Sequence, residues 1–300
     1  MGARLDQVVA TLAEGVTRGE VARAIREGAI LVSDIKKKPG YRVKPGEIIF
    51  GEIESKVEPE PFAEFIPLDI LYEDQWIIVV NKPAGIVVHP APGNSCGTLV
   101  NALLHHSPGL GIHSPSAPPR AGIVHRLDKD TSGVMVAAKS RQSFDFLQKE
   151  FSQRRVKKQY LALVTGNVEE LSGRIILPIG RHPIRRKIMA INTERARYAE
   201  TLWRVVKKMD GYTFMDVELK TGRTHQIRVH FRALGYPILG DKVYGFRKKK
   251  GLVVPRQMLH ARSLAFRHPW SGKRVDFSAP VPGDMVKVLE LLNSGFPLEF

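Results

Sequence analysis

An acidic, proline-rich stretch near residues 56–67 divides the sequence into a short part and a long part. Proline has no backbone amide hydrogen and also restricts the residue that precedes it, so we expect this stretch to be stiff, exposed and non-helical. We therefore predict a first domain over residues 1–56, a linker over 57–67 and a second domain over 68–300. The second domain is long enough to bury a large hydrophobic core.

The first domain contains the start and stop signals of a helix. Thr17 and Glu20 form a capping-box pattern, and Gly28 suits the position after the last turn. Val21 and Ile25 fall on one face of that helix. Short β segments are expected at residues 30–32, 41–43 and 48–50. The pattern predicts a small α/β module.

The second domain is mainly β with inserted helices. Phe144, Leu147 and Phe151 recur at helical spacing behind Ser140, which can cap the helix. The clearest expected strands are residues 76–80, 160–164 and 214–220. No repeat of 20–50 residues is apparent. The sequence predicts an α+β fold: a large mixed, mostly antiparallel domain behind the small module.

The charge of the protein is strongly positive and unevenly distributed. Lysine and arginine total 46 against 30 aspartates and glutamates, which gives a net charge of +16 and an isoelectric point near 10. Residues 1–60 carry ten charges of each sign, so residues 61–300 carry 36 basic and 20 acidic side chains. A protein this basic usually binds a polyanion, and nucleic acid is the first candidate.

Membrane association, export and thiol chemistry are disfavoured. No segment approaches 18 uninterrupted apolar residues, and the N-terminus lacks the apolar region of a signal peptide. The single cysteine, Cys96, excludes internal disulfides and fits a reducing compartment. We therefore expect a cytoplasmic protein that does not bind membranes.

Residues 122–133 concentrate charge at a bend between two apolar runs. Ile123 and Val124 precede the bend and residues 134–138 follow it, which predicts a strand, a tight loop and a second strand. Most loop aspartates only cap backbone amides. Here, however, Asp128 and Asp130 lie among cations, which keep a carboxylate ionised as a nucleophile or base requires. The neighbouring cationic or titratable residues are His125, Arg126 and Lys129.

A second basic motif, residues 221–232, directly follows the expected strand 214–220, in which apolar and charged residues alternate. Thr224 is expected to cap a helix that runs to Leu234. One face of this helix would turn toward the core and the other would be basic; the core face holds Ile227, Phe231 and Leu234, and the basic face His225, Arg228 and Arg232. The basic face is either simply solvated or part of an anion site, since a glycine turn that leads into a helix N-terminus suits phosphate.

A third basic run, residues 154–160, ends at Tyr160 at the start of an expected strand. Charge runs are usually only solvated. A basic groove beside an aromatic ring is nevertheless the arrangement that holds an unstacked base.

Metal and nucleotide chemistry can be set aside. His105, His106 and His113 are expected in a surface loop without matching carboxylates, and HExxH and P-loop motifs are absent. Residues 125–128 differ from the kinase catalytic loop because a leucine separates His-Arg from Asp, and no Asp-Phe-Gly follows. We expect no metal and no cofactor.

Five motifs in order resemble the RluA family of pseudouridine synthases, and the likeness covers nearly the whole chain. The motifs are Lys82–Gly85 with Val88–Pro90, His125–Gly133, Thr221–His230, Pro237–Asp241 and Leu259–Arg262. Residues 4–53 resemble an S4 (α-L type) RNA-binding domain, which precedes the catalytic domain in the RluD-like branch. This copy departs from the usual S4 pattern at Thr17-Arg18 and Ser33-Asp34.

The resemblance implies an isomerase that converts specific uridines to pseudouridine, and large-subunit (23S) ribosomal RNA is the expected substrate. Asp128 would be the catalytic carboxylate and would attack either the ribose or the uracil of a flipped-out nucleotide. Arg228 would pair with Asp128 and hold it ionised. Tyr160 would stack on the uracil and assist removal of the C5 proton. Arg126 would fill the gap that the flipped nucleotide leaves, whereas Asp130 would only stabilise the turn.

The resemblance also implies a set of RNA contacts. In the second domain these are His125, Arg126, Thr131, Arg223, His225 and Gln226, and in the first domain Arg18, Arg23, Arg26, Lys36, Lys37 and Lys38. The expected partner is ribosomal RNA or a pre-ribosomal particle, bound by a monomer.

Two rival interpretations remain open. A non-enzymatic RNA-binding or ribosome-assembly factor would have the same charge, but binding alone does not require Asp128, Tyr160 and Arg228 together. An enzyme of the same class could act instead on transfer RNA, because the S4-like module favours ribosomal RNA only by analogy.

Overall fold

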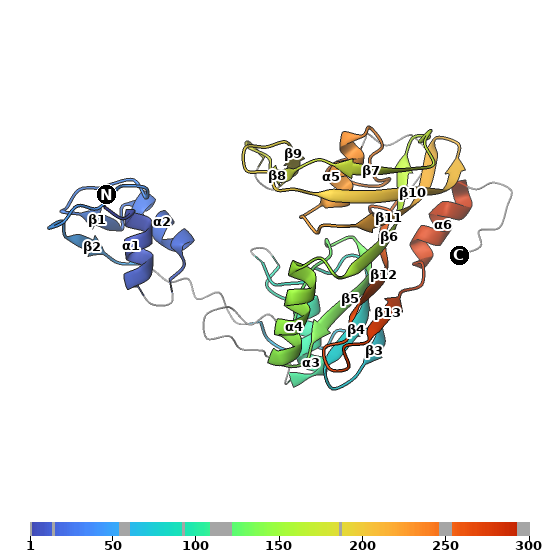
Figure 1. Cartoon of the computed structure of the whole chain (residues 1–300), viewed down its shortest axis with the longest axis horizontal. Coiled ribbons are helices and arrows are strands. Elements are labelled where there is room, and N and C mark those ends of the chain that lie inside the picture. Colours follow the sequence, from blue (N-terminus) through green and yellow to red (C-terminus); the bar gives the residue numbers. More distant parts are fainter. Residues whose placement is uncertain are drawn as a thin grey trace. The chain divides into compact units, whose positions relative to one another are not determined.

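The computed structural model describes residues 2–13, 16–53, 61–91, 94–108, 122–185, 188–245 and 254–292. The described residues up to Ile53 form one compact unit, and the described residues from Pro61 onward form another (Figure 1). None of the helices in these described ranges is long and apolar enough to cross a bilayer.

The small unit has two helices and a two-stranded antiparallel sheet. The elements are α1 (Leu5–Leu12), α2 (Arg18–Glu27), β1 (Ile30–Val32) and β2 (Ile49–Gly51). The predicted helix is confirmed: Thr17 and Glu20 cap each other, and Gly28 takes the left-handed conformation with φ 89°. Val21 and Ile25 are fully buried in its core. The strand predicted at 41–43 is wrong, because Arg42 makes only an isolated bridge with Arg4.

The large unit is built on a nine-stranded sheet in the order β3-β4-β5-β12-β6-β11-β10-β7, with β13 paired to β12. Every pairing is antiparallel except β5 with β12, so the predicted mixed, mostly antiparallel sheet is confirmed. The strands are β3 (Ile70–Glu73), β4 (Ile77–Lys82), β5 (Ser132–Ala138), β6 (Lys157–Thr165), β7 (Ser172–Ile176), β10 (Glu200–Met209), β11 (Tyr212–Leu219), β12 (Leu259–Arg267) and β13 (Arg274–Ser278). A separate small sheet joins β8 (Ile179–Arg181) and β9 (Met189–Ile191).

Helices cover both faces of this sheet, which explains why β4 lacks polar alternation. Ile78 belongs to the core cluster that includes Phe231, whereas Ile77 belongs to the cluster that includes Leu147. The helices are α3 (Leu99–His106), α4 (Arg141–Ser152), α5 (Gln226–Ala233) and α6 (Gly283–Leu292). Ser140 caps α4 by accepting a hydrogen bond from the Ser143 amide, as predicted.

Three local predictions are wrong. Residues 123–124 form no strand, because Ile123 makes only an isolated bridge with Ala137. Helix α5 begins at Gln226 after His225, whose left-handed backbone (φ 55°) makes the preceding turn, so Thr224 is not its cap. His105 and His106 lie in the last turn of α3 and not in a loop, while His113 lies outside the described residues.

Part of the expected linker packs on the large unit. The Asn101 amide nitrogen Nδ2 donates to the carbonyl oxygen of Phe62 at 2.7 Å, and the Gly97 backbone amide donates to Glu64 Oε2 at 2.7 Å. Residues 61–69 have no regular secondary structure, and residues 54–60 lie outside the described ranges.

Candidate active site

Asp128 lies on the loop that leads into β5. The Thr131 amide donates to the Asp128 carbonyl oxygen at 3.1 Å, which closes a tight turn. The Gly85 amide donates to the Lys129 carbonyl oxygen at 2.9 Å, so a second segment holds the same turn. The side chain of Asp128 remains 19% exposed. The carboxylate therefore reaches solvent from a loop whose backbone is fixed.

Arg228 of α5 links two carboxylates. Its Nη1 donates to Asp128 Oδ2 at 2.8 Å, while Nε and Nη2 donate to both oxygens of Asp241 at 2.6 and 2.9 Å. Arg228 is only 6% exposed, and the Asp241 side chain is fully buried. A guanidinium held in this bidentate way cannot rotate, so the orientation of the Asp128 carboxylate is set by Asp241.

The charges of this triad support one another. Burial alone would lower the pKa of Arg228, but the hydrogen bonds and charge of Asp241, with those of Asp128, raise it above its ordinary value. Burial alone would raise the pKa of Asp241, but Arg228 and two backbone amides lower it. The amides belong to Val243 and Tyr244. Arg228 and Asp241 therefore stay ionised as a pair.

His225 and Tyr244 border the second oxygen of Asp128. His225 Nε2 lies 3.8 Å from Asp128 Oδ1, beyond hydrogen-bond distance. The other ring nitrogen, Nδ1, is 2.8 Å from the Tyr244 hydroxyl, which accepts a hydrogen bond from the Met189 amide. The Arg228 guanidinium lies 5.0 Å from the centre of the Tyr244 ring. Among the described residues, Oδ1 is thus the oxygen of Asp128 that can meet a ligand.

Tyr160 lies on β6, in the core cluster that also contains Ile227 of α5. The side chain is nearly buried, and burial, with the charge of Asp128, raises the pKa of its phenol well above the ordinary value. The hydroxyl is therefore protonated throughout the physiological pH range, so Tyr160 offers a ring face and a neutral O–H group.

Lys82 supports the loop from inside the protein. The side chain is fully buried, and Nζ donates to the carbonyl oxygens of Pro83, Ile86 and Lys129 at 2.7, 3.0 and 3.1 Å. Burial and the nearby charge of Arg256 lower its pKa to about 7, against the opposing effect of the loop aspartates. The amine thus ties the chain after β4 to the turn that carries Asp128.

We expect replacement of Lys82 by Met to change how stability depends on pH. In wild type the folded pKa is about 7 and the unfolded value about 10.4. The unfolded chain therefore binds more protons between these values, and the free energy of unfolding should rise with pH over that window by up to about 1.4 kcal/mol per pH unit. The variant has no titrating amine at this position and lacks this pH-dependent gain. The free energy of unfolding of wild type minus that of Lys82→Met should therefore increase from pH 7 to pH 10.

Urea unfolding at pH 7, 8.5 and 10 measures this difference. Lys287→Met, at an exposed lysine of α6, is the matched control and should show no such trend. A Lys82→Met deficit that is constant across the three pH values would contradict the depressed pKa.

Arg256 and Gln257 fix the end of the same loop. Arg256 donates to the Asp130 carbonyl oxygen and to Ser132 Oγ, both at 3.1 Å, and forms a bidentate ion pair with Asp284 of α6 at 2.6 and 2.9 Å. Gln257 Nε2 donates to Thr131 Oγ1 at 2.8 Å. The backbone carbonyl oxygen of Asp130 thus helps to hold the turn.

Comparison with known proteins identifies the class of this site. Residues 76–233 match the family described as RNA pseudouridylate synthase, and residues 3–49 match the S4 domain. The chain belongs to the RNA pseudouridylate synthase family. The predicted resemblance, fold class and enzyme class are confirmed, and this pseudouridylate synthase is accordingly an isomerase.

Individual relatives cover almost all of this synthase. It is 41% identical to ribosomal large subunit pseudouridine synthase D of Pseudomonas aeruginosa, over 97% of this chain and 92% of the relative. It is 42% identical to the protein of the same name from Nitrosomonas europaea, over 98% and 85% respectively. Among solved structures it resembles human RNA pseudouridylate synthase domain containing 4, with a TM-score of 0.60 and 26% identity over 76% of this chain and 94% of the human chain.

Two residues predicted as RNA contacts of the synthase are internal, so that interpretation is wrong for them. Thr131 and Gln226 are each about 2% exposed. The Gln226 side chain accepts from Thr221 and the Arg223 amide and donates to Glu200 and Thr201. These hydrogen bonds of the side-chain amide stabilise the start of α5, the helix that carries Arg228.

His125 is also bound into the scaffold. Its Nε2 accepts a hydrogen bond from the Val136 amide at 3.1 Å, and its ring stacks on Phe151 with centres 4.7 Å apart. Burial, with the charge of Lys158, lowers the pKa of His125 to about 3. The ring is therefore neutral and holds β5 against α4.

The remaining predicted RNA contacts are exposed or partly exposed, and their role stays a prediction. Arg126 is exposed beside Asp128, and Arg223 is half-buried, with its Nε donating to the Tyr198 carbonyl oxygen at 3.0 Å. In the small unit Arg18 forms an ion pair with the buried Asp6 at 2.9 Å, and this pairing reduces the positive charge that Arg18 presents to RNA. The other basic side chains there are at least partly exposed: Arg23, Arg26, Lys36, Lys37 and Lys38.

Sequence reasoning assigned no role to Asp241, Lys82 or Arg256. Asp241 and Lys82 lie in two of the motifs that carry the family resemblance, Pro237–Asp241 and Lys82–Gly85. Membership in those motifs was the one sequence signal that could have marked the two residues as part of the site. Their function depends on burial and on partners far along the chain, such as Asp284 for Arg256, and a single sequence does not give those distances.

Proposed function

We propose that this synthase converts specific uridines of large-subunit ribosomal RNA to pseudouridine, with Asp128 as the nucleophile. The observation that carries the proposal is the chain of contacts Asp241–Arg228–Asp128, which holds Oδ2 of the partly exposed Asp128 side chain and leaves Oδ1 3.8 Å from His225 Nε2, beyond hydrogen-bond distance. The ribosomal target is supported by the names of the relatives from Pseudomonas aeruginosa and Nitrosomonas europaea.

The reaction rearranges one nucleotide and needs no net exchange of atoms. Asp128 forms a bond to C1′ of the ribose or to the uracil ring, and the N1–C1′ bond breaks. The uracil turns so that C5 bonds to C1′, and the bond to Asp128 breaks, which regenerates the carboxylate. C5 loses one proton to a base and N1 gains one proton, so the nucleotide keeps its atoms. Arg228 orients the attacking carboxylate, because its Nη1 donates a hydrogen bond to Oδ2 at 2.8 Å and places a positive charge beside it.

The target uridine must leave the RNA helix to reach Asp128, which costs a few kcal/mol of lost stacking. Tyr160 offsets part of this cost by stacking on the uracil, a contact typically worth about 1–3 kcal/mol per base. Arg126, exposed two residues before Asp128, would occupy the gap in the helix.

We expect Tyr160→Phe to keep RNA affinity within about twofold but to slow turnover. The phenyl ring retains the stacking face, while loss of the hydroxyl removes a proton carrier, a type of group worth roughly 10²–10⁴-fold in rate. Single-turnover kinetics and RNA binding measure the two effects. Tyr212→Phe, at a buried tyrosine of β11, is the matched control; equal turnover in both variants would restrict Tyr160 to stacking.

We place the S4-like RNA-binding domain at residues 1–56, the linker at 57–67 and the catalytic domain at 68–300. The family matches at 3–49 and 76–233 support these limits. The protein would act as a cytoplasmic monomer on RNA or a pre-ribosomal particle and without a cofactor, since an isomerisation requires no oxidant or reductant.

Mapping pseudouridine in total RNA from cells with and without this protein tests the proposal. Loss of particular pseudouridines from large-subunit ribosomal RNA is the expected result. Loss from transfer RNA alone would contradict the ribosomal target, and an unchanged map would contradict the activity of this chain on cellular RNA.

A further inference from the structure

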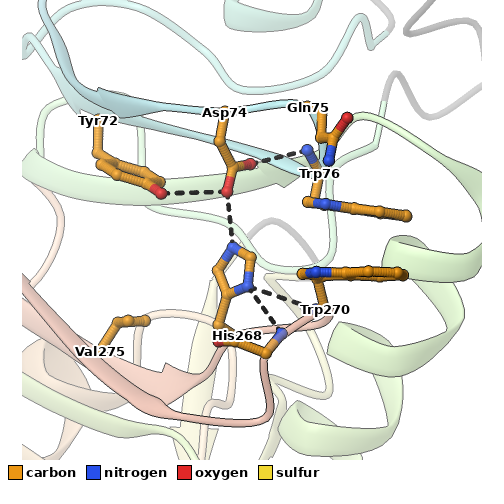
Figure 2. Close-up of a pocket in the computed structure, with 8 residues that line it drawn as sticks. Tyr72, Asp74, Gln75, Trp76, His268, Trp270 and Val275 are labelled. Atoms are coloured by element: carbon orange, nitrogen blue, oxygen red, sulfur yellow. Dashed lines mark hydrogen bonds and ion pairs between the residues drawn. The ribbon is translucent and has the colours of Figure 1, made fainter.

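The hairpin turn between β12 and β13 presents a tryptophan to solvent. Trp270 is 66% exposed, and its ring stacks on that of Trp76 with centres 4.7 Å apart and planes inclined by 8° (Figure 2). One face of the Trp270 ring is thus supported by protein. A flat, supported aromatic ring at a surface is suited to stack with another flat ring.

Hydrogen bonds hold the two tryptophans in place. His268 Nε2 lies 2.8 Å from Asp74 Oδ2, and His268 Nδ1 accepts from the backbone amides of Trp270 and Ser271 at 3.3 and 3.4 Å (Figure 2). Asp74 Oδ1 in turn accepts from the Trp76 amide at 2.7 Å. The stack is therefore preorganised, so binding a third ring would cost little side-chain entropy.

The surface beside the stack is hollow, and Trp76, one of the residues that line it, has a buried donor without a partner among the described residues. A hollow of about 300 Å³ is lined by both tryptophans, Asp74 and His268. The indole Nε1–H of Trp76 is buried and has no hydrogen-bond partner within the ranges that the structure describes. A buried donor without an acceptor is costly unless a ligand or water supplies one.

Three exposed cations flank Trp270 along the chain of the hairpin. Arg267 and Arg274 are directly opposite each other in the β12–β13 register, and Lys273 precedes Arg274. Like charges at opposite positions destabilise a hairpin, and an anion between them removes that cost. Asp276, two residues further along β13, is the one carboxylate in residues 267–276, so this segment carries a net charge of +2.

We infer that this hairpin tip, residues 267–274 with Trp76, is a second RNA contact in which Trp270 stacks an unpaired base and the cations bind the flanking phosphates. This inference rests on the proposed function, because it takes RNA as the partner. Phosphate binding explains the opposed arginines, and base stacking explains an exposed but fixed tryptophan. A protein partner would leave the three positive charges unexplained.

The tip lies far from the catalytic loop along the same strands. β12 runs parallel to β5, with His260 opposite Ser132 next to that loop. Arg267 is seven residues further along β12, which corresponds to roughly 23 Å at about 3.3 Å per residue. The stacked base would therefore be several nucleotides away from the target uridine, and the contact would position the RNA without touching the reacting atoms.

Binding of a ten-residue oligoadenylate, which contains no uridine to react, tests the inference. We expect Trp270→Ala to weaken binding about tenfold, within the range for a lost base–aromatic stack, and Trp270→Phe to stay within threefold of wild type. Quenching of tryptophan fluorescence by the oligonucleotide should be lost in Trp270→Phe. Leu171→Ala, at a leucine that is 71% exposed, is the matched apolar control and should bind like wild type.

The salt dependence of the same binding tests the cations. Replacing Arg267 and Arg274 together by Gln should reduce the slope of log affinity against log salt by about 1.4, whereas Lys287→Gln should leave the slope unchanged. Wild-type affinity in Trp270→Ala would overturn the inference. Weaker binding in Trp270→Ala with an unchanged slope in the double variant would overturn the assignment of phosphate to the arginines.

Conversion of uridine in a large-subunit ribosomal RNA transcript separates this inference from the proposed function. A wild-type protein that makes no pseudouridine but loses oligoadenylate binding in Trp270→Ala would refute the function and keep the RNA contact. A wild-type protein that makes pseudouridine, with a Trp270→Ala variant that matches it in kcat/KM and in binding, would keep the proposed function and refute the RNA contact at Trp270.

Discussion

We expect Asp128→Asn to lower turnover of uridine by a factor on the order of 10³ or more, as is typical when a nucleophile is removed. The amide has almost the same shape as the carboxylate, and its oxygen can still accept a hydrogen bond from Arg228. RNA binding should therefore stay within about threefold of wild type. Single-turnover formation of pseudouridine and filter binding of the same RNA measure the two quantities.

Asp130→Asn is the matched control for this substitution. Asp130 lies on the same turn, but the contact that holds it is made by its carbonyl oxygen to Arg256, and the substitution leaves that atom in place. We expect turnover within about tenfold of wild type. Equal losses in the two variants would show a general effect of loop charge and would remove the special role of Asp128.

Most of the expected strands and the helix caps at Thr17 and Ser140 could be predicted because their signals are local. The capping box at Thr17 and Glu20 and the apolar spacing in α4 depend on residues within a few positions of one another. The failed strands at 41–43 and 123–124 have suitable residues, but a strand also needs a partner. Arg42 and Ile123 find only isolated bridges, and nothing in their own segments encodes this.

The burial of the site could not be predicted from the helical pattern. Periodicity counts Arg228 as polar and Leu234 as apolar, yet Arg228 is 6% and Leu234 41% exposed. Arg228 can be buried because Asp241, thirteen positions away, supplies two acceptor oxygens. The pairing of Arg228 with Asp128 was expected only through the family resemblance, and the 2.8 Å contact spans one hundred positions.

Removal of the Arg228 charge should reduce stability as well as catalysis. Arg228→Leu leaves the fully buried carboxylate of Asp241 without a cationic partner, a change that typically costs about 3–5 kcal/mol. It also removes the donor that orients Asp128. We expect a lower free energy of unfolding in urea and turnover reduced by at least about 10²-fold, as for the loss of one preorganised hydrogen bond.

The double variant Arg228→Leu/Asp241→Leu separates the two effects. Replacing both members of a buried ion pair by apolar residues is often neutral or stabilising, because neither charge of the pair is left buried and unpaired. Asp128 also loses its cation, but its side chain is 19% exposed to solvent. Stability should therefore return toward wild type while turnover stays low, since Asp128 still lacks its partner. Recovery of turnover together with stability would mean that Arg228 serves only the fold, and that the carboxylate of Asp128 needs no charged partner to react.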